Sequence, residues 1–252
     1  GKITRNATDL FNKKTIKMEY RKLGNTELEL SAITYGAFAI GGNMWGGNEQ
    51  KDSIASVQAS IENGVTTLDT APFYGFGLSE KMIGEAIKGY DRTKIQLLTK
   101  FGLVWDGSNQ GKGEFFFDAE ENGKAIPVYK YASKANIIKE VEESLKRLQT
   151  DYIDLLQIHW PDTTTSISET MEALEILIQQ GKIRAAGVSN YSVDQVEEAR
   201  KTLNIASNQV GYSMLNRAIE HDLVPFAQQQ PDGKRFVDWK ILYRRKIKRK
   251  RS

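Results

Sequence analysis

Apolar and polar positions along the chain divide it into two kinds of alternating segment. Short apolar runs without a strict two-residue alternation predict buried strands, and apolar residues three or four positions apart predict helices. The apolar runs predict strands over 32–36, 65–69, 95–100, 153–159, 184–188 and 207–212. The helical spacing predicts helices beginning at Asp52, Ser79 and Ser133 and others over 168–180, 193–203 and 219–229. Strands that alternate with helices in this way favour a parallel sheet covered by helices.

Three further local features can be predicted. A short hairpin with Gly24-Asn25 at its turn precedes the first strand of the sheet. Ser79 is expected to cap the helix that follows the second strand. Residues 102–132 are rich in glycine and aromatic side chains. We expect this segment to be a functional loop, because it is too long for a simple connection.

The glycine clusters distinguish between two parallel-sheet architectures. A dinucleotide-binding sheet of the Rossmann type places Gly-x-Gly-x-x-Gly after its first strand. The cluster that begins at Gly41 does not have this spacing, and Gly75-Phe-Gly77 follows the second strand instead. The sequence therefore predicts an α/β barrel, of which about six strand–helix units are present after the N-terminal hairpin.

Composition excludes some classes of site and partner. The 252 residues include no cysteine, which removes disulfides and thiolate metal sites and suits a reducing, cytoplasmic location. No apolar run approaches the length of a membrane span, and no metal site is expected. The last ten residues, YRRKIKRKRS, carry a dense positive charge that nucleic acid could contact, but a solvated tail is the favoured interpretation.

Four side chains of different chemistry stand at successive strand ends. Asp69 ends the second strand with Tyr74 in the loop beyond it, and Lys100 and His159 end the third and fourth strands. Each alone has an ordinary explanation, such as a turn cap or a solvated lysine. Because a β/α barrel builds its active site at the C-terminal ends of its strands, we expect the four to converge.

Their chemistry is complementary. An ammonium beside a phenol stabilises the phenolate by about 1.4 kcal/mol per unit of pKa depression. Lys100 can supply this charge to Tyr74, Asp69 can hold Lys100, and His159 can donate to a carbonyl oxygen. This set is equipped to reduce a carbonyl group, provided that another molecule supplies hydride.

No side chain of this set can donate hydride, so a nicotinamide cofactor is implied. Ser189, Asn190 and Gln209 offer donors and acceptors for its carboxamide, and Tyr212 offers a ring on which it can stack.

Several long motifs resemble those of the aldo-keto reductase family: LDTAPFYGFGLSEKMIG, LLTKFG, SLKRLQTDYIDLLQIHWPD, GKIRAAGVSNYS and NQVGYSMLNR. The resemblance covers about residues 18–230 and is strongest to the bacterial stress-protein and sugar-reductase branch. It implies a (β/α)₈ TIM barrel, NADP(H), and reduction of small-molecule aldehydes or ketones. It assigns the catalytic tetrad to Asp69, Tyr74, Lys100 and His159 and nicotinamide binding to Ser189, Asn190, Gln209 and Tyr212. Trp45, Trp105 and Trp160 are expected to form pocket walls, with core packing the alternative for Trp160.

The ends depart from the family. Residues 1–17 are expected to be a non-native or disordered leader, and 231–252 form a basic tail that lacks the family's pyrophosphate loop. Codons for 231–243 can be chosen so that the adjacent reading frame encodes PMENGLLIGKY, which resembles that loop. We therefore interpret the chain as C-terminally truncated by a frameshift, with weak or no activity and weak NADPH binding expected.

Two other functions remain open. The chain could be a non-catalytic binding or regulatory subunit with the reductase fold, like the potassium-channel β subunits that resemble reductases. Nucleic-acid binding through the basic tail ranks last, because the rest of the chain has no basic stripe. The sequence names neither the carbonyl substrate nor the oligomeric state.

Overall fold

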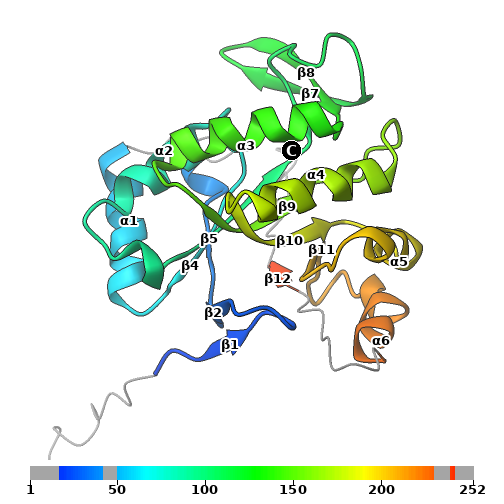
Figure 1. The fold of residues 1–252 in the computed structure, drawn as a ribbon. Helices are drawn as coiled ribbons and strands as arrows, with labels where there is room; N and C mark the ends of the chain where they lie inside the picture. Colours follow the sequence, from blue (N-terminus) through cyan, green and yellow to red (C-terminus); the bar gives the residue numbers. More distant parts are fainter. Residues whose placement is uncertain (1–16, 42–49, 230–238, 242–252) are drawn as a thin grey trace, which may run out of the picture.

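The computed structural model describes residues 17–41, 50–229 and 239–241 (Figure 1). Within these residues the main sheet has seven strands in the order β12-β11-β10-β9-β5-β4-β3. They are β3 (Tyr35–Gly36), β4 (Thr67–Asp69), β5 (Gln96–Phe101), β9 (Ile153–Ile158), β10 (Ile183–Ser189), β11 (Asn208–Gly211) and β12 (Trp239–Ile241). All neighbouring strands are parallel and follow chain order. This is the curved sheet of an incomplete β/α barrel, as the sequence predicts.

Helices follow the strands and cover the outer face of the sheet (Figure 1). The α-helices are α1 (Gln50–Glu62), α2 (Leu78–Ala86), α3 (Lys134–Leu148), α4 (Ile167–Gln179), α5 (Val193–Thr202) and α6 (Leu223–Gln228). Short 3₁₀ turns are η2 (Ala39–Gly41), η3 (Arg92–Lys94) and η4 (Ala218–Glu220). No described helix has the length and apolarity that crossing a membrane requires.

Successive residues of each strand face opposite sides, which separates core from chemistry. Leu97 and Leu156 belong to the apolar cluster between sheet and helices. Leu98 and Leu155 belong to a second cluster, together with the leucines of the hairpin formed by β1 (Tyr20–Lys22) and β2 (Glu29–Ser31). Lys100 shares the side of Leu98, so it faces the concave interior of the sheet.

Three expectations about local structure need correction. Ser79 does not cap α2, because the N-cap is Gly77 at a φ of 92°. Asp52 is the third residue of α1, which begins at Gln50. The helix expected over 219–229 is broken into η4 and α6, and α6 starts anew because Asp222 caps it. Within the segment 231–252 the structure describes β12, which pairs in parallel with β11.

The expected loop over 102–132 is largely a second, antiparallel sheet. Its strands are β6 (Leu103–Val104), β7 (Glu114–Glu121) and β8 (Lys124–Lys130), in the order β6-β8-β7. It projects beyond the N-terminal end of α3 in Figure 1. The segment thus follows Lys100 directly and lies on the side of the barrel where the strands end.

Candidate active site

An ion pair between neighbouring strands forms the centre of the site. Lys100 Nζ on β5 lies 3.0 Å from Asp69 Oδ1 and 3.1 Å from Oδ2 on β4. Lys100 is 2% exposed and Asp69 4% exposed, so the pair is shielded from water. The ammonium also donates to the carbonyl oxygen of Thr70 at 3.0 Å. These contacts hold the lysine in one orientation, because each fixes the direction in which one N–H of the ammonium points.

The same ammonium reaches Tyr74. Nζ lies 5.1 Å from the centre of the Tyr74 ring. Burial on its own lowers the pKa of Lys100, but the charge of Asp69 and hydrogen bonds with Asp69 and Tyr74 outweigh it, so the net shift is upward. The lysine is therefore charged at neutral pH, as a group that stabilises a phenolate must be.

His159 completes the set on the other side of Tyr74. The two rings are 5.7 Å apart between centroids, in an edge-to-face arrangement. Burial, and then the charge of Lys100, hold the pKa of His159 well below its usual value. A neutral imidazole results, which can donate one N–H to an uncharged oxygen. The structure thus brings together the four side chains that the sequence places at strand ends.

The loop that carries Tyr74 is held by a close backbone crossing. Gly75 has a φ of +62°, and a Cβ built on it would lie 2.0 Å from the carbonyl oxygen of Gly41. A Cβ on Gly41 would lie 2.7 Å from the carbonyl carbon of Tyr74. Both positions require glycine, since any side chain would push η2 away from the tyrosine loop.

The residues expected to bind nicotinamide connect directly to this centre. Ser189 Oγ donates to the carbonyl of Gln209 at 2.7 Å, and Asn190 Nδ2 donates to the carbonyl of His159 at 3.0 Å. Gln209 Nε2 lies 3.3 Å from Asp69 Oδ2. Gln209 is 4% exposed, and its Oε1 is a buried oxygen without a hydrogen-bond partner in the described structure. That oxygen fits a carboxamide N–H₂ donor.

Tyr212 is placed less directly. It follows β11 and is half-buried, and its hydroxyl donates to Glu220 Oε1 at 2.5 Å. Arg217 holds the same carboxylate, at 2.9 Å from Nε to Oε1. These contacts fix the hydroxyl end of Tyr212 to Glu220, and its expected stacking role stays a prediction.

Of the three expected pocket tryptophans, two are in the described structure and Trp45 lies outside it. Trp160 follows His159 and packs against Phe116 of β7 in a tilted arrangement, with the ring centroids 5.3 Å apart. Trp105 packs on Phe73, the neighbour of Tyr74, at 5.8 Å. Phe73 in turn contacts Phe117 at 5.6 Å, and Phe116 and Phe117 are 5.0 Å apart. A continuous row of rings therefore runs from the tyrosine loop to the histidine loop.

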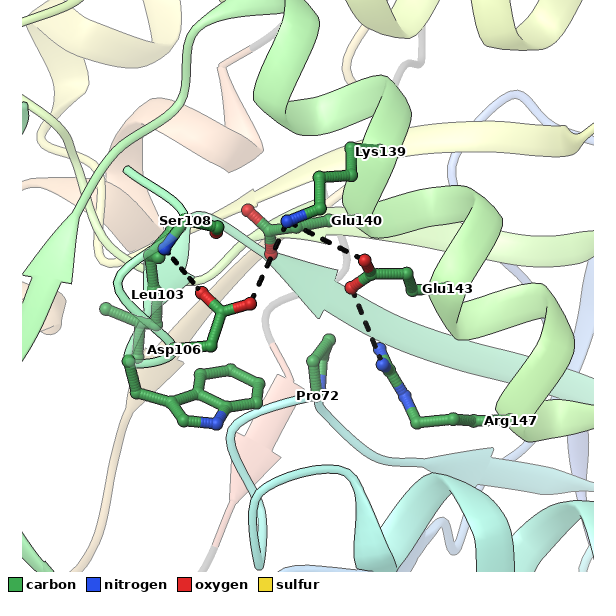
Figure 2. Close-up of a pocket in the computed structure, with 10 residues that line it drawn as sticks. Pro72, Leu103, Asp106, Ser108, Lys139, Glu140, Glu143 and Arg147 are labelled. Carbon is green, nitrogen blue, oxygen red and sulfur yellow. Dashed lines mark hydrogen bonds and ion pairs between the residues drawn. The ribbon is translucent and has the colours of Figure 1, made fainter. Parts of the chain in front are cut away.

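A small separate cavity of about 30 Å³, open on one side, lies between α3, Pro72, and β6 with the residues that follow it (Figure 2). Lys139 bridges Asp106 and Glu143 there, and Arg147 lies 3.8 Å from Glu143. Glu140 is buried beside it, and both of its oxygens accept from the backbone N–H of Gly102. None of the four candidate catalytic residues lines this cavity. Through Glu140 and Lys139, the polar groups of this cavity connect α3 to the segment that directly follows β5, the strand that carries Lys100.

Two residues contribute to the centre of the site in a way that the sequence does not predict. Thr70 contributes a carbonyl to Lys100, and Ser79 contributes a hydroxyl that bonds to Thr70 rather than to its own helix. Ser79 could be singled out from sequence, but only as a helix cap. Among the described residues, no group of three or more His, Cys, Asp or Glu side chains is arranged to hold a metal ion.

Comparison with known proteins agrees with this geometry. The model of the Aldo/keto reductase family matches residues 32–251. The chain is 43% identical over 212 residues to the aldo-keto reductase YhdN of Bacillus subtilis, covering 84% of this chain and 59% of that protein. It is 36% identical over 211 residues to the NADH-specific methylglyoxal reductase of Escherichia coli, covering 82% of this chain and 62% of that protein.

Solved structures give the same result. The glycerol dehydrogenase of Gluconobacter oxydans superposes with a TM-score of 0.71 at 36% identity, covering 86% of this chain and 61% of that one. An aldo/keto reductase of Klebsiella pneumoniae in complex with NADP and acetate superposes with a TM-score of 0.63 at 32% identity, covering 80% of this chain and 61% of that one. The chain spans about 60% of the length of the curated relatives it matches. With its fold, its buried Asp69–Lys100 pair and these matches, the chain belongs to the aldo/keto reductase family.

Proposed function

We propose that this chain carries the catalytic centre of an NADP(H)-dependent reductase that converts aldehydes or ketones to alcohols. One observation supports this most directly: the buried Lys100 ammonium is held by both oxygens of Asp69 while it lies 5.1 Å from the Tyr74 ring. Such a pair supplies a phenol with the positive charge that it needs to give up a proton near neutral pH.

Tyr74 is the proton donor in this proposal. When bound, the nicotinamide supplies a hydride to the carbonyl carbon, and the Tyr74 hydroxyl gives its proton to the carbonyl oxygen, so that an alcohol forms. The phenolate left on Tyr74 is stabilised by Lys100, which Asp69 holds in place. His159, kept neutral by its surroundings, donates its N–H to the same oxygen and orients it.

The cofactor preference is the finer part of the proposal. The unpaired Oε1 of Gln209, with Asn190 and Ser189 beside it, supports a nicotinamide site next to Asp69. NADP(H) is favoured by the sequence motifs, and a structural relative carries NADP, whereas the Escherichia coli relative is NADH-specific. Weak NADPH binding by this chain stays a prediction of the sequence analysis, as does a cytoplasmic location.

The row of aromatic rings supports a small organic carbonyl compound as the substrate. Trp160 and Trp105 stand next to the loops of His159 and Tyr74, so we propose that they form pocket walls. An apolar wall of aromatic rings excludes water from the reacting carbonyl, which strengthens the hydrogen bonds that Tyr74 and His159 offer.

The direct test is to incubate the chain with methylglyoxal and either NADPH or NADH, and to quantify both the alcohol and the oxidised cofactor. One alcohol formed per cofactor consumed, at the low rate expected for this chain and faster with NADPH than with NADH, is the expected result. Saturable NADPH binding without alcohol formation from any carbonyl in a broad panel would favour the non-catalytic binding subunit instead. A higher rate with NADH would correct the cofactor preference and leave the reaction intact.

A further inference from the structure

The side chain of Ser79 lies in the middle of a buried hydrogen-bond chain. Its Oγ donates to the carbonyl of Ala37 at 2.8 Å and lies 2.8 Å from Thr70 Oγ1. A serine hydroxyl has one hydrogen, and the carbonyl of Ala37 can only accept it, so the hydrogen between the two hydroxyls comes from Thr70. Thr70 and Ser79 are both 0% exposed, and no water competes for these bonds.

The residues of this hydrogen-bond chain are also bonded, through their backbone groups, to the catalytic residues. Through its own carbonyl, Thr70 accepts from Lys100 Nζ at 3.0 Å, and through its N–H it donates to the carbonyl of Leu98 at 2.9 Å. The N–H of Ser79 donates to the carbonyl of Tyr74 at 3.1 Å. Ala37 closes the ring, because its N–H donates to the carbonyl of Asp69 at 2.8 Å.

The hydrogens of Lys100 explain why this matters. An ammonium has three of them. Asp69 and the carbonyl of Thr70 accept hydrogen bonds from this ammonium, and so does Tyr74. If the carbonyl of Thr70 turns away, the ammonium is free to rotate about its last bond, and its alignment with the phenol is lost. The hydroxyl of Thr70 prevents that rotation by fixing its own residue to Ser79.

We propose that Thr70 and Ser79 act together as positioning residues, whose buried hydroxyl pair keeps the Lys100 ammonium directed at Tyr74. This inference rests on the proposed function in one respect, that Tyr74 is the group Lys100 serves. Neither residue touches the substrate. The pair lies in the connection between β4 and α2. The Ser79 hydroxyl is available for Thr70 because it does not cap α2, whose N-cap is Gly77.

The test uses the full chain and a matched set of variants. Thr70→Val removes the hydroxyl at nearly constant volume, whereas Thr70→Ser keeps it. Ser79→Ala removes the acceptor from the other side, in case the valine variant does not fold. Thr170→Val is the control, because Thr170 on α4 is also buried and its hydroxyl also makes a buried hydrogen bond, to the carbonyl of Ala132, without contact to Lys100 or Tyr74 in the described structure.

Two readouts are compared at matched stability. With saturating NADPH and methylglyoxal, Thr70→Val and Ser79→Ala should lower kcat about ten-fold, the effect of one lost hydrogen bond, with KM changed less than two-fold. Thr70→Ser should retain kcat within two-fold. The basic limb of the kcat–pH profile should move to higher pH in Thr70→Val and Ser79→Ala only.

The second readout needs no turnover. The ultraviolet titration curve of each variant carrying Tyr74→Phe is subtracted from the curve of the same variant with Tyr74 intact, which isolates the Tyr74 phenol. In Thr70→Val this phenol should ionise at higher pH than in the wild type, and in Thr170→Val it should not. If the wild type shows no turnover, the proposed reaction fails while this titration still decides the positioning role. Titration curves and kcat that are alike in Thr70→Val and Thr170→Val would overturn the inference.

Discussion

Lys100 Nζ and Asp69 Oδ1 lie 3.0 Å apart, with both side chains buried and on adjacent parallel strands. Parallel pairing places Asp69 beside Leu98, two residues before Lys100, on the concave face of the sheet. The lysine side chain therefore extends past the end of β4 to reach both Asp69 and the loop that carries Tyr74. This one pair joins the architecture of the sheet to the chemistry at its edge.

Asp69→Asn should weaken both the fold and the reaction. The amide keeps the shape but leaves a buried ammonium without a counter-charge, which costs about 3–5 kcal/mol when one partner of a buried pair is removed. Because the folded pKa of Lys100 is raised above 10.5, the stabilisation by the pair is fully present below that pH and is lost as pH rises through the folded value. Urea unfolding at pH 7 and at a pH well above 10.5 measures the loss of stability and its dependence on pH, and kcat measures the effect on the reaction.

The control for this variant is Asp91→Asn, at an exposed aspartate 3.8 Å from Lys94. It should change the free energy of unfolding by less than about 1 kcal/mol. Equal losses in the two variants would show that burial of the Asp69–Lys100 pair contributes nothing.

The neutral state of His159 predicts a pH dependence of stability. Its folded pKa is lowered well below 6.5, so the unfolded chain binds more protons below that pH. Stability should therefore fall as pH decreases below about 6.5, with a slope of up to about 1.4 kcal/mol per pH unit from this group. His159→Asn should remove that part of the slope, whereas His221→Asn, at the exposed second histidine, should not. Parallel stability curves for wild type and His159→Asn would contradict the prediction.

Glu140 predicts a dependence of the opposite sign. Burial raises its pKa to about 8, against hydrogen bonds from Gly102 and Asn136 that lower it. Between its unfolded value of 4.5 and about 8 the folded chain binds more protons, so stability falls as pH rises through this range. Glu140→Gln should flatten the curve of unfolding free energy against pH there. Glu121→Gln, at an exposed glutamate at the end of β7, should leave it unchanged.

The backbone crossing at Gly75 predicts a large effect from one methyl group. Gly75→Ala adds both an unfavourable φ and a collision with the carbonyl of Gly41, so it should displace the Tyr74 loop and lower kcat at least about 100-fold. Gly107→Ala is the matched control: its φ of +74° is equally unfavourable, but nothing lies within 4 Å of the new Cβ. It should cost about 1–2 kcal/mol of stability and leave kcat alone. Similar kcat values for the two variants would show that the crossing does not position Tyr74.

The convergence of the tetrad could be predicted from sequence because it follows from two facts alone, the positions of the strands and their parallel direction. Strands of a parallel sheet end at one edge, so Asp69, Lys100 and His159 meet once the apolar runs before them are recognised as strands. The alternation of residues along each strand then decides which side chains face the concave interior. The same argument applies to Ser189 and Gln209.

The use of the Ser79 hydroxyl could not be predicted in this way. A serine at the start of an apolar helix has the local signature of an N-cap, and only the tertiary approach of Thr70 and Ala37 gives it other partners. The hairpin over β7 and β8 had a usable signal. Asn122-Gly123, both at positive φ, is the sequence of a two-residue hairpin turn, but the run of three phenylalanines at 115–117 hides the strand alternation.

The central claim is that Tyr74 donates the proton, and the most direct measurement is the single-turnover rate of NADPH oxidation in wild type and Tyr74→Phe with methylglyoxal. The phenylalanine keeps the ring contacts with Phe38 and His159 and removes only the proton donor. Loss of general-acid catalysis predicts a rate lower by a factor of about 10²–10⁴, with NADPH affinity unchanged. A Tyr74→Phe rate within two-fold of a measurable wild-type rate would contradict the assignment of Tyr74 as the acid.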